Sequence, residues 1–146
     1  MKQIAELIQN QTLTVIESGF TVRNAAQTMT EHNIGAVAVV DSGKLSGIFS
    51  ERDLMARVVA KGLNPDDTTV GVVMSKDLVV AEPSDRIDAA IQKMHAIHAR
   101  HLPVVDDGKL VGMISIRDLL EMDDEQQRAK ATFLNDLVTY SPDYES

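Results

Sequence analysis

The chain contains no cysteine and no tryptophan, and aromatic residues make up only 3% of its 146 residues. Without cysteine, neither a disulfide framework nor a thiolate metal site can form, and thiol redox chemistry is excluded. No apolar run approaches the roughly 20 residues of a membrane-spanning helix, and the N-terminus lacks the apolar stretch of a secretory signal. We therefore expect a cytoplasmic protein with no membrane partner.

Basic side chains are outnumbered, with 14 Lys and Arg against 22 Asp and Glu and a net charge of -8. Residues 1–120 hold 15 acidic and 12 basic side chains, whereas residues 121–146 hold 7 and 2. Nucleic-acid binding requires a basic surface, so we expect no nucleic-acid partner. The 44% hydrophobic content is enough for a globular fold with an aliphatic core.

The most informative feature that is present is an internal repeat. Residues 22–55 recur as residues 87–120 at a constant offset of 65, with no gap. Each copy alone is too short to bury a comfortable core, so we expect the two copies to pack together. A cleft between two such copies would be lined by equivalent residues from both.

Hydrophobic periodicity predicts a strand, a helix, a hairpin and a second helix in each copy. In the first copy, Thr21 is placed to cap a helix from Val22 to about Asn33. Two apolar strands follow, residues 36–40 and 45–49, joined by a turn with Gly43. The second helix starts at Glu51 and ends before Gly62.

The second copy repeats this order. Its expected elements are an extended stretch from Leu78 to Ala81, a helix opened by Pro83-Ser84-Asp85 and running through His98, hairpin strands at 102–105 and 110–115, and a helix from Ile116. A final amphipathic helix is indicated by Ala129, Phe133, Leu137 and Tyr140. We expect a mixed α/β (α+β) fold of two tandem β-α-β-β-α repeats with pseudo-two-fold symmetry. The predicted boundaries are 1–67, 68–122, and 123–146 for the acidic C-terminal helix and tail.

Each copy ends its second hairpin strand with the same motif of glycine, two apolar residues, serine, one variable residue, arginine and aspartate. The two instances run Gly47-Ile48-Phe49-Ser50-Glu51-Arg52-Asp53 and Gly112-Met113-Ile114-Ser115-Ile116-Arg117-Asp118. One interpretation is a helix cap, in which serine and a carboxylate three residues later satisfy free backbone N–H groups. The other is a binding site, in which serine approaches phosphate and aspartate accepts from ribose hydroxyls. The two interpretations are compatible.

With this motif in both copies, the chain resembles the cystathionine-β-synthase (CBS) domain pair, often called a Bateman module. The resemblance covers the chain to about residue 122. It implies that adenosine-containing ligands bind in two clefts between the repeats. On that basis Asp53 and Asp118 would hold ribose diols, and Ser50 and Ser115 would approach phosphate.

The resemblance also implies roles for residues beside the motif. Arg100 and His101 precede the Leu102-Pro103-Val104 strand, and both side chains would reach phosphate in the cleft around Asp53, with Arg100 also available to Asp118. At the corresponding positions the first copy has neither a basic pair nor a proline, so the two clefts should differ in charge. The adenine base would be bordered by Leu13, Thr14, Leu78 and Val79, with Ile48 and Met113.

A polyphosphate approaching an acidic protein needs local positive charge. Arg52 and Arg117 occupy the first turn of the helix after each serine, and Lys76 lies near the same region. Arginine is suited to bidentate phosphate contact. The alternative for Arg52 and Arg117 is a solvated side chain or a salt bridge at a subunit interface.

Other signals are weak. His95, His98 and His101 are spaced by three, but no carboxylate or cysteine completes a metal site, so we expect no metal. No histidine stands at a repeated position that would activate Ser50 or Ser115, and no nucleophile elbow or Walker loop is present. We therefore expect a protein that is not an enzyme.

Two hypotheses about function follow. The first is a non-catalytic sensor that binds AMP, ADP, ATP or NAD(H), with AMP as the default, and signals to an unknown protein partner in trans. The second is a ligand-independent dimerisation or interaction scaffold, in which the serine and aspartate pairs act only as helix caps. The resemblance also implies a homodimer.

Overall fold

The computed structural model describes residues 2–122, which form two compact units. The first-repeat unit comprises Thr12–Val79 and Asp106–Val111. The second-repeat unit contains the chain up to Gln11, Val80–Val105 and the described residues from Gly112 onward. The units therefore do not follow the order of the sequence repeats, because the N-terminal segment packs with the second repeat. The repeat boundaries themselves stay a prediction.

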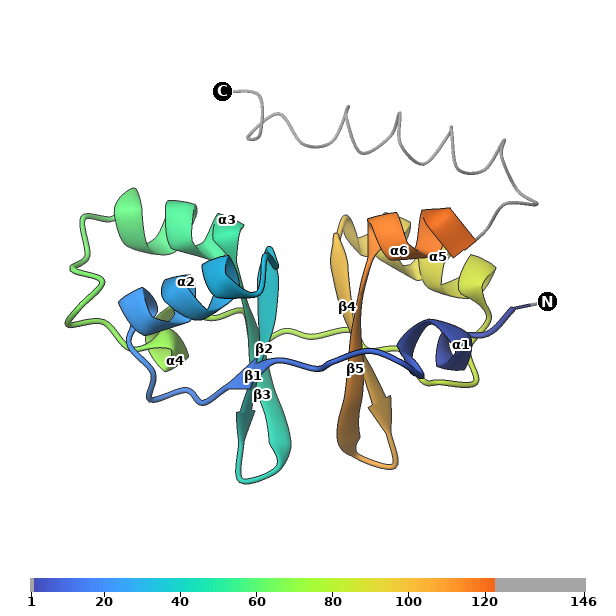
Figure 1. Cartoon of the computed structure of the whole chain (residues 1–146). Helices are drawn as coiled ribbons and strands as arrows, with labels where there is room; N and C mark the ends of the chain where they lie inside the picture. Colours follow the sequence, from blue (N-terminus) through green and yellow to red (C-terminus); the bar gives the residue numbers. More distant parts are fainter. Residues whose placement is uncertain (1, 123–146) are drawn as a thin grey trace. The chain divides into compact units, whose positions relative to one another are not determined.

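The first-repeat unit is a three-stranded sheet with helices on one side (Figure 1). Its elements are β1 (Val15–Ile16), α2 (Val22–Glu31), β2 (Ala36–Asp41), β3 (Lys44–Ser50), α3 (Glu51–Asp53), η1 (Leu54–Val59) and α4 (Val70–Val73). Strand β1 pairs in parallel with β2 because α2 carries the chain across, and β2 pairs antiparallel with β3. Side chains of Phe49, Val22 and Val58 are fully buried in its core.

Local signals account for the boundaries of α2 and of the hairpin. The Thr21 hydroxyl accepts a hydrogen bond from the Asn24 backbone at 3.1 Å, so the predicted cap is confirmed. Helix α2 ends two residues earlier than predicted because Asn33 has a left-handed φ of 52°. In the hairpin turn, Ser42 and Gly43 both have positive φ values, as a two-residue turn between twisted strands requires.

The helix predicted from Glu51 is present but changes geometry. Three residues of α-helix are followed by the π-helix η1, in which Ala60 donates to the carbonyl of Met55, five residues back. The chain then turns at Gly62, whose φ is +70°. Periodicity alone did not predict the wider turns.

The second-repeat unit pairs two strands and packs three helices against them (Figure 1). Its elements are α1 (Ile4–Ile8), α5 (Ile87–Ile97), β4 (His101–Asp106), β5 (Lys109–Ser115) and α6 (Ile116–Met122), except that the end of the hairpin, Asp106–Val111, belongs to the first-repeat unit. Helix α5 begins at Ile87, so the predicted start at Pro83 is wrong. Asp85 instead forms a turn, accepting from the Glu82 backbone at 2.9 Å. The core of this unit contains Ile4, Met94 and Leu102.

The extended stretch predicted from Leu78 to Ala81 forms a single β-bridge, between Ala81 and Val104 of β4. Ala81 donates to the Pro103 carbonyl at 2.9 Å and accepts from Val105 at 2.8 Å. Extending this parallel pairing along the strands would require a backbone N–H donor at residue 103 in one direction and at residue 83 in the other. Both residues are proline. Proline has no N–H, so the pairing stops at Ala81.

Two short helices that we did not predict, α1 and α4, have equivalent roles. Each lies beside the start of a repeat's first helix: Ile87 donates to the Lys2 carbonyl at 3.1 Å, and Val22 donates to the Thr68 carbonyl at 2.8 Å. These bonds satisfy N–H groups that a helix leaves open at its first turn. Helices of four or five residues have too little periodicity to be read from sequence.

The predicted final helix, with Ala129, Phe133, Leu137 and Tyr140, lies outside the described residues. None of the helices between residues 2 and 122 combines the length and apolar character needed to cross a bilayer.

Candidate functional site

The first repeated motif forms a corner where strand β3 meets helix α3, here called the Ser50–Asp53 corner. The Asp53 backbone donates to the Ser50 hydroxyl oxygen at 3.1 Å. The Ser50 backbone and hydroxyl both donate to Asp53 Oδ2 at 3.0 Å. Although it is charged, Asp53 is only 7% exposed. The hydrogen bonds offset the cost of burying its carboxylate.

The second motif forms the equivalent Ser115–Asp118 corner between β5 and α6. The Ser115 backbone donates to Asp118 Oδ2 at 3.1 Å, and the Asp118 backbone donates to the Ser115 hydroxyl at 3.1 Å. Both side chains are half-buried. The same local geometry is therefore built twice, once in each unit.

Both corners are reciprocal helix caps, so the capping interpretation of the motif is confirmed in geometry. Aspartate replaces the usual glutamate or glutamine of a capping box. A capping aspartate still has lone pairs for other donors, since each ionised carboxylate accepts about four hydrogen bonds. The cap therefore leaves the binding interpretation open.

The glycine that opens each motif allows another segment to cross the strand closely. A Cβ atom on Gly47 would lie 2.7 Å from the Ser75 carbonyl oxygen, and one on Gly112 would lie 2.6 Å from Ile8 Cγ2. Real Cβ atoms do not make such short contacts. The motif's glycine is therefore explained by packing rather than by ligand contact.

The residues after these glycines pair with the crossing segments. Ile48 exchanges two backbone hydrogen bonds with Ser75, at 3.0 and 2.8 Å. Met113 makes the corresponding bonds with the side-chain amide of Gln11, at 2.9 Å to Oε1 and 2.6 Å from Nε2. Any role of Ile48 and Met113 beside adenine stays a prediction.

Ser75 and Arg57 belong to the first corner, and sequence reasoning missed both. The Ser75 hydroxyl donates to Asp53 at 3.1 Å from Oδ1 and 3.4 Å from Oδ2. Arg57 Nε lies 3.7 Å from Asp53 Oδ1, and its Nη1 donates to the carbonyls of Val73 and Met74. Arg57 follows Asp53 by four residues, a spacing typical of helical ion pairs that would have identified it. Ser75 carries no such signal.

The predicted cationic residues differ in placement. Arg100 and His101 are half-buried, and the Arg100 carbonyl accepts from Ile116 at 2.9 Å, which puts Arg100 beside the second corner's helix. Arg52 and Arg117 are exposed. In the first corner the residue equivalent to Arg100 is Gly35, which accepts from Glu51 at 2.9 Å. These backbone bonds place Arg100 and Gly35 at equivalent positions, and a difference in charge between the two clefts stays a prediction.

Of the remaining predicted residues, Leu13 and Thr14 precede β1, Leu78 and Val79 lie outside the strands and helices, and Pro103 lies within β4. Leu13, Thr14 and Leu78 are half-buried, Val79 is exposed and Pro103 is buried. Their contact with adenine stays a prediction, as does the reach of Arg100 and His101 toward Asp53. Within residues 2–122, no three His, Asp or Glu side chains are grouped so that they could hold a metal ion.

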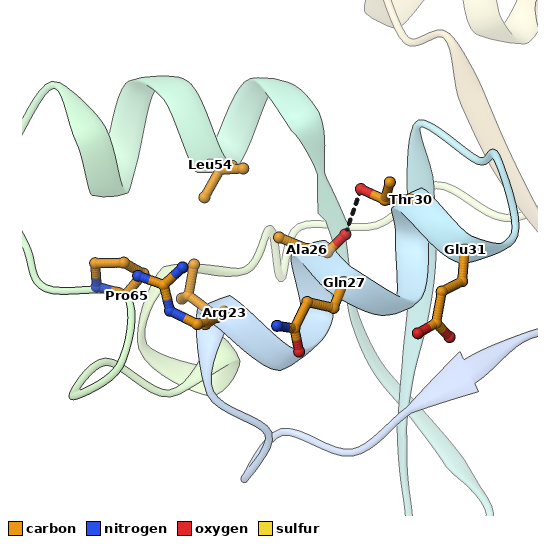
Figure 2. A pocket seen from close by; sticks show the side chains of 8 residues that line it. Arg23, Ala26, Gln27, Thr30, Glu31, Leu54 and Pro65 are labelled. Carbon is orange, nitrogen blue, oxygen red and sulfur yellow. Dashed lines mark hydrogen bonds between the residues drawn. The ribbon is translucent and has the colours of Figure 1, made fainter.

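A groove of about 640 Å³ lies between α2 and the α3–η1 helix (Figure 2). Its lining residues are Val22, Arg23, Ala26, Gln27, Thr30, Glu31, Leu54 and Pro65. Arg23 pairs with Asp66, and this hydrogen bond raises the pKa of Arg23. None of the predicted site residues lines this groove.

Known proteins share this sequence and fold. CBSX3, a mitochondrial CBS-domain protein of Arabidopsis thaliana, is 34% identical over 120 residues, which cover 79% of this chain and 58% of that protein. YhcV of Bacillus subtilis is 36% identical over 119 residues, covering 82% of this chain and 84% of YhcV. A CBS-domain structure from Burkholderia ambifaria has a TM-score of 0.80 at 33% identity, with 86% and 96% of the two chains covered. The chain thus spans little more than half of the first relative.

The family model described as CBS domain matches twice, over residues 4–60 and 70–125. These two matches contain the Ser50–Asp53 and Ser115–Asp118 corners. The chain belongs to the CBS domain family and is a tandem CBS pair.

Proposed function

We propose that this CBS pair is a non-catalytic regulatory module that binds an adenosine-containing nucleotide at its two serine–aspartate corners. The observation that carries the proposal is the repetition of one buried or half-buried carboxylate, held by a serine three residues earlier, in both units. AMP is the default ligand, with ADP, ATP and NAD(H) as alternatives.

The chemistry of the corners suits a ribose. An ionised carboxylate accepts hydrogen bonds from two neighbouring hydroxyl groups, which a ribose diol supplies. The backbone bonds of Asp53 and Asp118 hold each carboxylate in one orientation before a ligand arrives. Such preorganisation reduces the entropic cost of binding.

Phosphate would be held by cationic side chains near the corners. Arg100 and His101 are the first candidates, followed by Arg52, Arg117 and Lys76, which lie at exposed positions. In an acidic chain these groups provide the local positive charge that a nucleotide requires.

One protein of the same fold has been crystallised with adenosine compounds. The CBS domain pair of protein MJ0100, with a TM-score of 0.76, has a crystal structure in complex with 5′-methylthioadenosine and S-adenosyl-L-methionine. It is 23% identical to this chain, so it supports the fold, and the ligand is our proposal. The absence of a metal also stays a prediction, because Hypoxic Response Protein I, 26% identical, has a structure with two coordinated zinc ions.

Signalling would need a partner. Met55 and Val59 on η1 are 47% and 69% exposed, which leaves apolar surface available on the first-repeat unit. We propose that this surface contributes to a homodimer, and that nucleotide binding changes how an unidentified protein is bound in trans.

Calorimetric titration with AMP, ADP, ATP and NAD tests the proposal. We expect binding by the wild type, and loss of at least one site in each of D53N and D118N. Asparagine keeps an oxygen for the cap but loses the charge, so thermal melting should show that both variants fold. Absence of binding to any of these nucleotides would favour the scaffold hypothesis. Recovery of a hydrolysed nucleotide after incubation would contradict the non-catalytic assignment.

A further inference from the structure

Both oxygens of the Asp53 carboxylate are already engaged within its own unit. Oδ2 accepts from the backbone and hydroxyl of Ser50, each at 3.0 Å. Oδ1 accepts from the Ser75 hydroxyl at 3.1 Å and lies 3.7 Å from Arg57 Nε. A ribose diol needs acceptor positions on this carboxylate, so it must compete with groups that the protein itself supplies.

The carboxylate of Asp118 is less engaged. Considering residues 2–122, it accepts one hydrogen bond, from the Ser115 backbone to Oδ2, and Oδ1 accepts none. Asp118 is also half-buried, whereas Asp53 is 7% exposed. The second corner therefore presents an available acceptor oxygen.

The difference arises from the segments that cross the two strands. Ser75 pairs with Ile48 through its backbone, which leaves its hydroxyl directed at Asp53. Gln11 uses its side-chain amide to pair with Met113, and glutamine has no hydroxyl that could donate to Asp118. The repeat position equivalent to Arg57 is Met122, which carries no charge.

We propose that the Ser75 hydroxyl occupies the position of a ribose hydroxyl at Asp53 and so determines the affinity difference between the two corners. This inference rests on the proposed function. Nucleotide fills the Ser115–Asp118 corner first, and fills the Ser50–Asp53 corner only when it displaces the hydrogen bond of Ser75 to the carboxylate.

The charges next to Gly35 and at its counterpart Arg100 act in the same direction. Gly35 of the first corner lies against the Glu51 side chain, since a Cβ on this glycine would be 3.3 Å from Glu51 Oε1. The corresponding positions of the second corner are Arg100 and Ile116. At this position a carboxylate disfavours an anionic ligand at the first corner and an arginine favours it at the second, while the positive charge of Arg57 at the first corner already pairs with Asp53.

The test measures AMP affinity at each corner separately. D118N leaves the first corner as the AMP site, and D53N leaves the second. In the D118N background we expect S75A to tighten AMP binding about tenfold, because removal of a competing bond to a charged group is worth about 1.4 kcal/mol. In the D53N background S75A should leave the affinity unchanged.

Two control variants separate this effect from general loosening. S75T retains a hydroxyl and should restore the wild-type affinity of the first corner. S46A removes a different serine–aspartate bond in the same unit, that of Ser46 to Asp41 at 2.7 Å, and should not alter AMP binding. Because Ser75 pairs with Ile48 through its backbone, S75A should fold, and circular dichroism checks this.

The outcomes are distinguishable. If S75A leaves the first corner unchanged or weakens it, the role of Ser75 is refuted while nucleotide binding stands. If the first corner of the wild type binds AMP more tightly than the second, the order of filling is refuted. If neither the wild type nor any variant binds AMP or the other nucleotides, the proposed function fails, and this inference fails with it.

Discussion

The side-chain amide of Gln11 makes both hydrogen bonds to the backbone of Met113 that Ser75 makes to Ile48 with its own backbone. A side chain thus replaces a peptide group at the equivalent place in the second repeat. Each of these bonds satisfies a backbone N–H or C=O group at a strand edge that would otherwise be unpaired.

Replacement of Gln11 by alanine should destabilise the second-repeat unit. Two hydrogen bonds are lost, and because Gln11 is exposed we expect each to contribute near the lower end of about 0.5–1.5 kcal/mol, for a total of about 1 kcal/mol. Hydrogen exchange at the Met113 amide measures the effect. Q11E keeps the acceptor but loses the donor, so it should fall between wild type and Q11A; equal protection of Met113 in all three would contradict the role of this amide.

Alanine at Gly47 should destabilise the first-repeat unit by roughly 1–3 kcal/mol, as overpacking of a close contact does. The added Cβ would lie 2.7 Å from the Ser75 carbonyl, which is backbone and cannot swing aside. Chemical denaturation measures the loss. G19A is the matched control, since a Cβ on Gly19 meets no atom within 4 Å. Equal stability of G47A and G19A would refute the close crossing.

Asp41 should contribute stability that disappears in acid. The Ser46 hydroxyl, followed by the Ser18 backbone N–H, holds the pKa of Asp41 below its usual value. A carboxylate with a lowered folded-state pKa stabilises the fold above its unfolded pKa, about 3.9, and loses this contribution as the pH falls through the folded value. We expect D41N to be less stable than wild type at pH 6, with a difference that shrinks toward pH 3.

The repeat supplies the control for this pH dependence. Asp106 is the counterpart of Asp41 and is exposed, with no comparable bond in the part of the chain described. D106N should therefore follow the wild-type profile throughout. A D41N difference that stays constant between pH 6 and pH 3 would contradict the assignment.

Lysine at Val59 should weaken self-association if η1 contributes to a dimer. Val59 is 69% exposed, so the substitution should leave the fold intact while placing a charge on an apolar surface. Size-exclusion chromatography with light scattering measures the mass at several concentrations. V72K is the control, because Val72 is 72% exposed on α4. Identical masses for V59K, V72K and wild type would exclude this surface from the interface.

Sequence alone predicted the elements whose signals are local. The repeat located both motifs, Thr21 marked the start of α2, and the glycine of each turn marked a hairpin. Serine and aspartate at this spacing also indicated both caps. These features depend on contacts within a few residues, so the local sequence is enough to predict them.

Tertiary structure decided what depends on distant segments. Ser75 meets Asp53 from 22 residues away, and Gln11 meets Met113 from 102 residues away, so no spacing rule reveals either contact. The same holds for the exchange of terminal segments, in which the N-terminal helix α1 serves the second repeat. The sequence determined that there are two similar corners; packing of distant segments determined how they differ, because each crossing segment brings its own side chains to the strand.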